Sequence, residues 1–323
     1  MKTGATTLKS DSSLGAKLTA DRLASRRVSA RCVVCGGEGL LEHLAVGGDA
    51  GAEGLIPTTD KFGTALSDIV RCPACTHMQL RAIPTEAELE QAYGEAASDD
   101  YVEEEAGQRA TARELLARLE HHVEKGALLD LGCWVGFLLD EARARGWDPV
   151  TGVEPSEFAS AYARDRLRLD VRTEDLMTAD VPAGRHQAVV LGDVIEHLPD
   201  PGAALERVSK LLAPGGAVML MLPDAGSRLA RAMGTRWWSV IPTHVHYFTR
   251  TSLTRLLSDR GFELRHVGTA PKAFTVRYYL DRVGGYSPPL ARAMVAGAGA
   301  VGVADRMWAP DFRDRMVAIA VRR

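Results

Sequence analysis

Four of the five cysteines in this sequence form two closely spaced pairs, Cys32/Cys35 and Cys72/Cys75. Each CxxC pair can present two thiolates from a tight turn, and two such turns complete the tetrahedral ligand shell of Zn²⁺. Four thiolates leave no coordination position open, so the spacing predicts a structural zinc site and not a catalytic one. His77 follows the second pair and is an alternative ligand, although the four cysteines suffice.

Acidic residues stand where several expected strands end. LLDLGCWVG places Asp130 in an apolar strand that runs into Gly132 and Gly136, and PVTGVEPS ends the next strand at Glu154. A carboxylate at that second position can accept hydrogen bonds from both hydroxyls of a ribose. Asp193 follows a later strand, QAVVLG. The GxGxxG pattern of dinucleotide dehydrogenases is absent, which counts against a nicotinamide cofactor.

The elements that position these residues follow a repeating order. Strands are expected at 127–131, 149–153, 170–172, 187–192 and 216–222, alternating with helices at 136–145, 156–167 and 202–212. This alternation is typical of a parallel sheet with helices on both faces, in which ligands bind at the carboxyl ends of the strands. We expect an α/β, Rossmann-like seven-stranded sheet. A helix in FTVRYYLDRV and a last strand in RMVAIAV would complete it, with one antiparallel edge strand.

The chain divides into four parts. Residues 1–29 are rich in Ser, Thr, Lys and Ala and are predicted to be disordered, and residues 30–83 form the zinc-ribbon module. Residues 84–123 are a helical linker or lid, and residues 124–323 form the α/β domain. In the linker, Tyr93 and Tyr101 are candidates for closing over the site, with solvated tyrosines as the alternative.

Composition and charge narrow the classes of function. The chain has 39 basic and 42 acidic residues, so its formal net charge of −3 makes no global case for binding nucleic acid or an anionic membrane. The N-terminus lacks the apolar core of a signal peptide, and the longest apolar run, 293–304, is too short to span a bilayer. We expect a cytoplasmic protein, and the sequence leaves its oligomeric state open.

Four motifs, in order, resemble those of class I S-adenosylmethionine-dependent methyltransferases. They are LLDLGCWVG, GVEPS, DVIEHLPDP and LLAPGG, and the similarity spans about 107–268. The preceding RCPACTHMQLRAIPTEAELEQAYG is similar to the zinc-ribbon prefix of one branch, which often methylates sugars and natural products. WWSVIPTHVHYFTRTSLTRLLSDRGF is similar to a later segment of that branch. The resemblance therefore covers nearly the whole chain after residue 31.

The resemblance implies how the glycine loop would bind S-adenosylmethionine. Asp130, Gly132 and Gly136 would hold its methionine part, and Glu154 its ribose. The family pattern has glycine at position 134, where this sequence has Trp134. We expect the cofactor to bind nonetheless, with the indole turned toward cofactor or substrate. Packing of the indole in the core is the alternative.

Further residues acquire roles by the same resemblance. Glu174, in VRTEDL, would meet the adenine, with Asp175 as the alternative because the register is ambiguous there. Asp193 would line the cofactor pocket near the transferred methyl group. Trp237 and Trp238 are candidates for an aromatic wall beside a sugar or ring, and core packing is an equal alternative.

Methyl transfer to a hydroxyl needs a group that takes the acceptor's proton, and histidine titrates in the right range. The candidates are His244 and His246 in PTHVHYFT, which match histidines of the branch's similar segment. Residues two apart on an extended segment share one face, so both rings would point toward the pocket. A structural histidine is the alternative for each.

The same histidines allow a second interpretation. DVIEH followed by THVHYF resembles the metal site of ubiquinone-biosynthesis O-methyltransferases and small-RNA 2′-O-methyltransferases. The matching positions are Asp193, Glu196, His197 and His244, which would hold a divalent ion at the substrate oxygen. Asp193 is shorter than the glutamate of that pattern, so we favour a base that acts without metal.

The expected function is methylation of a small molecule, such as a sugar or natural-product intermediate, at oxygen, nitrogen or carbon. An RNA methyltransferase that uses the zinc ribbon to hold nucleic acid is the alternative, but Lys and Arg are scattered and form no basic patch. A non-catalytic cofactor-binding protein is a third hypothesis, motivated by Trp134.

Overall fold

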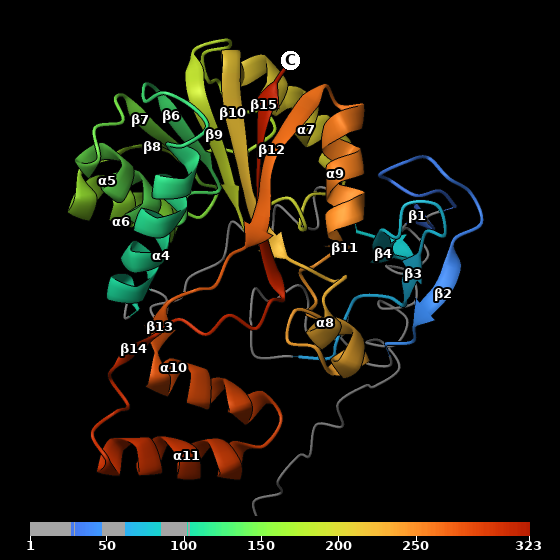
Figure 1. The fold of residues 1–323 in the computed structure, drawn as a ribbon, viewed down its shortest axis with the longest axis vertical. Helices are drawn as coiled ribbons and strands as arrows, with labels where there is room; N and C mark the ends of the chain where they lie inside the picture. The colour runs from blue at the N-terminus through green and yellow to red at the C-terminus, as the bar shows by residue number, and fades with distance from the viewer. Residues whose placement is uncertain (1–26, 29, 47–61, 85–101, 103) are drawn as a thin grey trace, which may run out of the picture.

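A seven-stranded sheet forms the centre of the protein in the computed structural model, which describes residues 27–28, 30–46, 62–84, 102 and 104–323 (Figure 1). The strand order is β12-β15-β10-β9-β6-β7-β8. The strands are β6 (Leu128–Leu131), β7 (Val150–Val153), β8 (Asp170–Arg172), β9 (His186–Gly192), β10 (Leu212–Pro223), β12 (Phe262–Thr269) and β15 (Arg315–Arg322). The expected seven-stranded α/β sheet is confirmed.

One strand, β15, runs against the others, and its position differs from the sequence expectation. β6 to β10 pair in parallel, whereas β15 pairs antiparallel with both β10 and β12. The antiparallel strand is therefore inside the sheet and not at its edge. Burial explains this order, because residues 316–320 of β15 are all buried, whereas Phe262 is the one buried residue of β12. A fully apolar strand needs neighbours on both sides, and a half-exposed strand tolerates an edge.

Helices cover both faces of the sheet. They are α4 (Glu105–Leu119), α5 (Phe137–Ala144), α6 (Glu157–Leu167), α7 (Pro201–Leu211) and α9 (Arg250–Asp259). In β9, Val189 and Leu191 pack in one core with α7 and α9, while Val190 packs in a second core with α4 and α5. The alternation follows from the two-residue period of a strand. Each face of the sheet is therefore apolar and packs against its own layer of helices.

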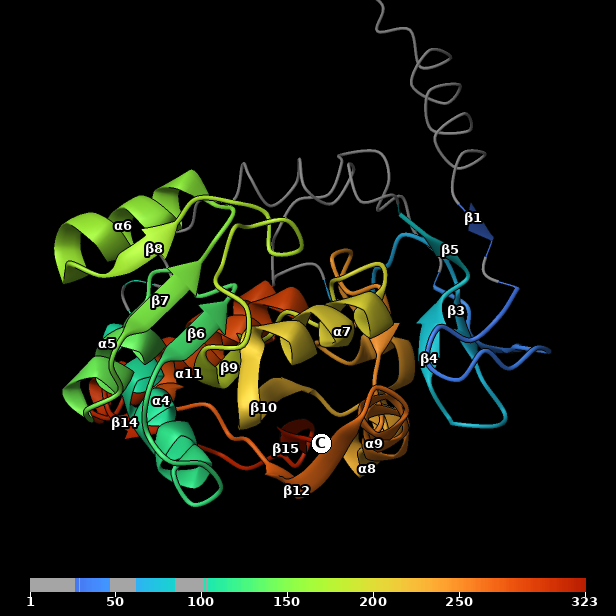
Figure 2. The ribbon, with the colours of Figure 1, turned by 90° about the horizontal axis from the view of Figure 1, so that it is seen from above.

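The N-terminal module shares a sheet with the large domain. Its strands are β2 (Leu41–Leu44), β3 (Ile69–Arg71) and β4 (Met78–Leu80), with a separate pair formed by β1 (Arg27–Val28) and β5 (Ala82–Ile83). β4 also pairs with β11 (His246–Tyr247), so one four-stranded sheet contains both parts. Leu80 of the module packs in one buried cluster with Trp237 and Val245 of the large domain. The module lies beside α9 in both views (Figures 1 and 2).

An insertion, residues 270–314, leaves the sheet after β12 and returns at β15. It contains β13 (Phe274–Thr275), α10 (Val276–Asp281), the 3₁₀ turn η2 (Arg282–Gly285), α11 (Pro288–Ala300) and β14 (Met307–Trp308). The helix expected in FTVRYYLDRV is α10, which is shorter than that stretch. Glu104, just before α4, accepts hydrogen bonds from the Thr275 backbone N (2.8 Å) and Oγ1 (2.6 Å). The insertion is thereby fastened to α4, below the carboxyl ends of the parallel strands in Figure 1.

A short segment after β10 completes the fold, with α8 (Arg228–Met233) and the 3₁₀ turn η1 (Gly234–Arg236). Tyr93 and Tyr101, the expected lid residues, and most of the predicted disordered N-terminus lie outside the described residues. Among the helices that are described, none is long and apolar enough to cross a bilayer.

The buried cluster that contains Leu80, Trp237 and Val245 predicts that the module and the adjoining part of the large domain unfold together. Leu80 is fully buried, so Leu80→Ala should lower the free energy of unfolding by about 2–5 kcal/mol. Hydrogen exchange should then show faster exchange in residues 237–247 as well as in the module. Leu41→Ala is the control, because Leu41 lies in the same small sheet and its side chain is 58% exposed. Faster exchange confined to the module would contradict a shared core.

Candidate active site

A cavity of about 1470 Å³ opens at the carboxyl ends of the parallel strands. Most of the residues predicted for the site line it: Asp130, Gly132, Trp134, Glu154, Glu174, Asp175, Asp193 and His244. Gly136 and His246 are not among its lining residues. The cavity therefore lies where ligands bind in open α/β sheets.

The glycine loop turns sharply between β6 and α5. Gly132 and Gly136 have positive φ values of 80° and 84°. A Cβ at Gly132 would lie 2.5 Å from Val194 Cγ2, and one at Gly136 would lie 2.7 Å from Leu169 Cδ1. Both positions therefore require glycine. Gly136 shapes the loop at the start of α5 without lining the cavity.

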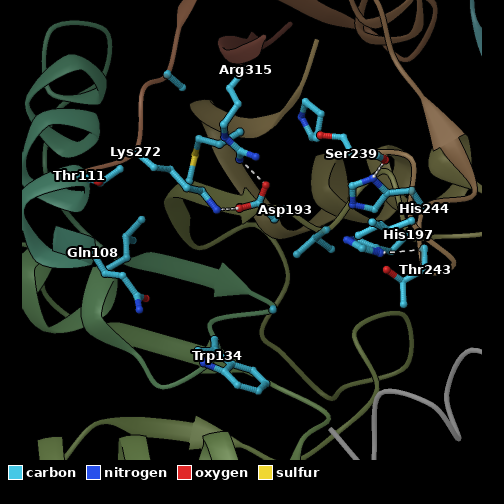
Figure 3. Close-up of a pocket in the computed structure, with 18 of the residues that line it drawn as sticks. Gln108, Thr111, Trp134, Asp193, His197, Ser239, Thr243, His244, Lys272 and Arg315 are labelled. Carbon is cyan, nitrogen blue, oxygen red and sulfur yellow. Dashed lines mark hydrogen bonds and ion pairs between the residues drawn. The ribbon is translucent and has the colours of Figure 1, made fainter. Parts of the chain in front are cut away.

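Trp134 occupies the left-handed region with φ 49°, which explains the family preference for glycine there. Its indole packs near the ring of Phe158 on α6, with 6.4 Å between centroids, and also lines the cavity. The indole thus lies at the cavity wall and packs beside a neighbouring helix, while its contact with cofactor or substrate stays a prediction. The loop keeps its turn with tryptophan, and the indole is drawn among the residues that line the cavity (Figure 3).

Glu154 links the glycine loop to the start of α6. One carboxylate oxygen accepts from the Trp134 backbone N and the other from the Ser156 backbone N, both at 2.9 Å. A carboxylate has about four acceptor sites, so each oxygen can accept one more hydrogen bond. The side chain is buried at the cavity wall. This geometry fits the two hydroxyls of a ribose.

Asp130 lies deep in the cavity beside Glu154. Burial, and then the charge of Glu154, raise the pKa of Asp130 to about 8, and burial also raises the pKa of Glu154. A cationic group bound beside them would favour the ionised carboxylates and lower both pKa values. The amino group and sulfonium of S-adenosylmethionine are cations of this kind, so the residues fit that cofactor.

Glu174 and Asp175 both line the cavity, but Asp175 is engaged by its own turn. Its Oδ1 accepts from the backbone N of Met177 (2.8 Å) and Thr178 (3.0 Å). Glu174 makes one such contact, with its Oε2 accepting from the Asp180 backbone N at 3.1 Å. Glu174 therefore has more acceptor capacity left for a ligand than Asp175.

Asp193 is held by two cations that lie far from it in the sequence. Its Oδ2 accepts from Lys272 Nζ at 2.6 Å, and its Oδ1 pairs with the Arg315 guanidinium (Figure 3). Burial opposes ionisation, but the charges of Arg315 and Lys272 outweigh it and hold the pKa of the Asp193 carboxyl well below its usual range. Asp193 is thus an ionised pocket residue whose carboxylate is already paired. Lys272 and Arg315 line the same cavity.

His244 and His197 lie together beside this ion pair. His244 Nδ1 donates to the Ser239 carbonyl oxygen at 2.7 Å, and His197 Nδ1 donates to the Thr243 carbonyl oxygen at 2.9 Å. Burial lowers the pKa of both rings, that of His197 to about 4, so both are neutral near pH 7. A neutral ring with its proton on Nδ1 has an acceptor at Nε2.

Glu196 brings a third acceptor to this group. The ligand atoms of Glu196, His197 and His244 all lie within 4.8 Å of one another. Both carboxyl oxygens of Glu196 are buried and have no hydrogen-bond partner among the described residues. Burial, and then the charge of Asp193, raise its pKa to about 8. Three of the four residues of the expected metal set therefore assemble, whereas the carboxylate of Asp193 is paired elsewhere.

His246 is placed differently from the sequence expectation. Its ring is buried against His77 of the N-terminal module, with Nδ1 3.4 Å from His77 Nε2, and it is not among the cavity lining. The expectation that both rings share one face assumed an extended segment. β11 begins only at His246, and residues 242–243 form a turn, so His244 lies outside the strand. The alternation of a strand does not apply across this boundary.

The two adjacent tryptophans have different roles. Trp237 is buried, and its Nε1 donates to Asp314 Oδ2 at 3.1 Å. Trp238 lines the cavity and packs edge-on to Phe312, with 5.6 Å between ring centroids. The core alternative therefore applies to Trp237 and the wall alternative to Trp238.

The four cysteines of the module converge. Cys32 Sγ lies 3.5 Å from Cys75 Sγ, and Cys35 Sγ lies 3.6 Å from Cys72 Sγ. These separations exceed a disulfide bond of about 2.05 Å and approach the ~3.8 Å edge of a tetrahedron built on Zn–S bonds of about 2.3 Å. Two equivalent turns present the pairs, because the Gly36 backbone N donates to the Cys32 carbonyl and the Thr76 backbone N to that of Cys72. The donor set and its spacing fit a tetrahedral metal ion.

Comparison with known proteins agrees with this geometry. The profile of the family described as methyltransferase domain matches residues 103–267. The ubiquinone biosynthesis O-methyltransferase of Leptothrix cholodnii is 28% identical over 170 residues, which cover 48% of this chain and 72% of the relative. The enzyme of the same description from Pseudomonas aeruginosa is 34% identical over 168 residues, with coverage of 47% and 72%.

A solved structure from Thermotoga maritima, described as an SAM-dependent methyltransferase and possible histamine N-methyltransferase, is 16% identical with a TM-score of 0.48. It covers 70% of this chain and 94% of its own. The family profile covers more than half of the sequence, and the Pseudomonas relative exceeds 30% identity over most of its own length. The chain belongs to the methyltransferase domain family, and it is an S-adenosylmethionine-dependent methyltransferase.

Proposed function

We propose that the enzyme methylates a small molecule bound in the same cavity as the cofactor, and that His244 takes the proton of the acceptor. The observation that carries this proposal is the hydrogen bond from His244 Nδ1 to the Ser239 carbonyl. This hydrogen bond places the ring proton of His244 on Nδ1 and leaves Nε2 unprotonated. The His244 side chain lines the cavity, so Nε2 is the candidate base there. A base within reach of an acceptor hydroxyl is what transfer to oxygen requires.

The cofactor is assigned to the end of the cavity formed by the glycine loop. Glu154 would accept from the ribose hydroxyls, Asp130 would lie near the cationic methionine part, and Glu174 would meet the adenine. When bound, S-adenosylmethionine supplies a methyl group on a positively charged sulfur. The chain's own contribution is to orient the acceptor toward that group and to remove its proton at His244.

A small acceptor is favoured over RNA by the way the N-terminal module is used. β4 pairs with β11, and the Thr76 hydroxyl lies 2.8 Å from that of Thr249 in the large domain. Phe62, which precedes the second cysteine pair, lines the cavity. The module thereby supplies a wall of the site. Lys and Arg together number 39 against 42 acids, which is no charge excess for nucleic acid.

A second candidate mechanism rests on the convergence of Glu196, His197 and His244. Three acceptor groups in one buried place are unfavourable unless a proton or a cation lies among them. Both histidines donate their Nδ1 proton to a backbone carbonyl, which is how metal-binding histidines are commonly oriented. A divalent ion held there would act near the acceptor oxygen. The metal-free base remains our first proposal, because Asp193 is paired with Lys272 and Arg315 and adds no fourth ligand.

We also propose that Zn²⁺ binds to Cys32, Cys35, Cys72 and Cys75 and stabilises the module. The two turns already bring the thiols together, and burial of three of the four excludes water from the site. Thiolate binding energy is coupled to folding, so the ion would hold the module against β11 and the cavity wall.

The cofactor assignment predicts that Glu154→Gln weakens binding of S-adenosylhomocysteine by about 10- to 100-fold, since charged hydrogen bonds are lost. The NH₂ group of the glutamine would also face one of the two backbone N–H groups, of Trp134 or Ser156, that Glu154 now accepts from, and two donors cannot bond each other. Titration calorimetry measures the affinity, and Asp165→Asn, an exposed change on α6, is the control. Equal affinity of the Glu154→Gln variant and the wild-type protein for S-adenosylhomocysteine would contradict the assignment.

The base assignment predicts that His244→Gln lowers turnover by about 10²–10⁴-fold while S-adenosylhomocysteine still binds. Turnover is measured as release of S-adenosylhomocysteine with a panel of hydroxylated acceptors. If the base acts without metal, Glu196→Gln should lower turnover less than His244→Gln does. EDTA should then leave turnover unchanged at concentrations at which elemental analysis still finds the metal bound to the cysteines.

A divalent ion predicts different results in the same assays. Glu196→Gln and His244→Gln would then be equally damaging, and EDTA would abolish activity that Mg²⁺ or Zn²⁺ restores. Full turnover in His244→Gln would exclude both mechanisms.

The zinc proposal predicts about one equivalent of zinc per chain by elemental analysis. Cys72→Ser should lower metal content and thermal stability together, because a ligand is lost from a closed shell. Cys133→Ala is the matched control, since this fifth cysteine is buried but lies outside the cluster. Wild-type stability in metal-free protein would refute a structural zinc.

A further inference from the structure

The end of the cavity away from the glycine loop is built of aromatic side chains. Ten of the chain's 19 Phe, Tyr and Trp residues line the cavity. Eight of them form its outer part, which we call the aromatic compartment: Phe62, Trp238 and six residues of the insertion between 274 and 312. The volume of about 1470 Å³ exceeds the roughly 300–1,000 Å³ typical of a site for one ligand. There is room for an acceptor beside the cofactor.

The rings of the aromatic compartment touch one another and form a wall. Phe312 lies 5.6 Å from Trp238 and 6.3 Å from Trp308, and Trp308 lies 5.5 Å from Tyr279, all between ring centroids. Their interplanar angles of 61° to 83° are edge-to-face arrangements. Such pairs stabilise each other and hold ring faces in fixed positions.

A second set of contacts joins the module to the insertion across the compartment. The rings of Phe62 and Tyr286 are 5.5 Å apart. The Arg282 guanidinium lies 5.7 Å from the centroid of Phe62 and 4.9 Å from that of Tyr278. Planar groups from two distant parts of the chain therefore enclose the same space.

The eight aromatic side chains of the compartment offer mainly ring surface. The Tyr279 hydroxyl donates to the Lys272 carbonyl at 2.5 Å, and the Tyr286 hydroxyl donates to the Arg236 carbonyl at 2.6 Å. These hydroxyl protons are therefore committed to the backbone. A sugar lying against these rings would bring several hydroxyls that need partners, and any left unpaired on this side would oppose binding. A flat apolar ring needs none.

Part of the wall is also left uncovered. Trp308, Phe312 and Tyr286 are 46%, 43% and 37% exposed, although each lines the cavity. Exposed apolar surface gathered at the mouth of a cavity marks a place where a ligand completes the burial.

We propose that the aromatic compartment binds a flat, largely apolar ring system, so that the acceptor is a hydroxylated aromatic molecule and not a sugar. This inference rests on the proposed function, because it places the acceptor in the cavity of the cofactor. The ring lies against the aromatic wall, and its hydroxyl is directed toward His244. The chemical class follows from the wall: many ring faces, one guanidinium among them, and the hydroxyls of Tyr279 and Tyr286 already bonded to backbone carbonyls.

The experiment compares two neutral probes that carry hydroxyls, 2-naphthol and methyl β-D-glucopyranoside. Titration calorimetry measures their binding to the full chain saturated with S-adenosylhomocysteine. We expect 2-naphthol to bind at least about tenfold more tightly, and Trp308→Ala to weaken it by about tenfold, the scale of a lost aromatic contact. Leu290→Ala is the control, because Leu290 is 51% exposed in the same insertion and does not line the cavity.

The affinity of each variant for S-adenosylhomocysteine is measured first. An affinity equal to that of the wild-type protein shows that the variant is folded and that the cofactor end of its cavity is intact. Tighter binding of the glucoside, or 2-naphthol binding that Trp308→Ala and Phe312→Ala both leave unchanged, would overturn the inference while the proposed function stands. Failure of the wild-type protein to bind S-adenosylhomocysteine would instead count against the proposed function.

Discussion

The carboxylate of Asp193 holds the two halves of the site together. Asp193 directly follows β9, and its two cations stand at the two ends of the insertion: Lys272 precedes β13, and Arg315 begins β15. One acidic side chain thus fastens both ends of a long excursion to the carboxyl edge of the sheet. Replacing it would leave two cations unpaired at the cavity wall, and an uncompensated charge of this kind is costly.

The cavity has two ends that are built from different parts of the chain. The parallel strands and the glycine loop form one end, and added segments form the other: the insertion from the C-terminal side and the cysteine module from the N-terminal side. The sheet edge is the conventional ligand position of α/β folds, and the added segments contribute further walls to the same cavity. The buried cluster that joins Leu80 to Trp237 and Val245 explains why the module belongs to the site.

The sequence predicts best what local patterns determine. Strand–helix alternation gives the sheet, and the residues at strand ends, such as Asp130 and Glu154, line the cavity as expected. The order of β12 and β15 could not be read from alternation, because it depends on which strand is more completely buried. His246 shows a similar limit: its face was inferred from a strand that begins two residues later than assumed.

The features of the site that the sequence did not predict depend on contacts between residues far apart in the chain. Nothing near Asp193 in the sequence indicates that residues 79 and 122 positions away would pair with it. Phe62 likewise reaches the cavity through long-range contacts, since the next residue, Gly63, donates its backbone N–H to the Val240 carbonyl at 2.9 Å. The insertion did carry a signal, since residues 274–312 are rich in Phe, Tyr and Trp, but its sequence alone does not say that they face one another.

We propose that one cavity holds the cofactor at the glycine loop and the acceptor under the aromatic wall, with His244 between them. A crystal structure of the protein with S-adenosylhomocysteine and 2-naphthol tests this directly. We predict ribose hydroxyls bonded to Glu154, the naphthol ring against Trp308 and Phe312, and its oxygen within hydrogen-bond distance of His244 Nε2. Cofactor density away from Glu154, or a naphthol ring bound outside the cavity, would contradict the account.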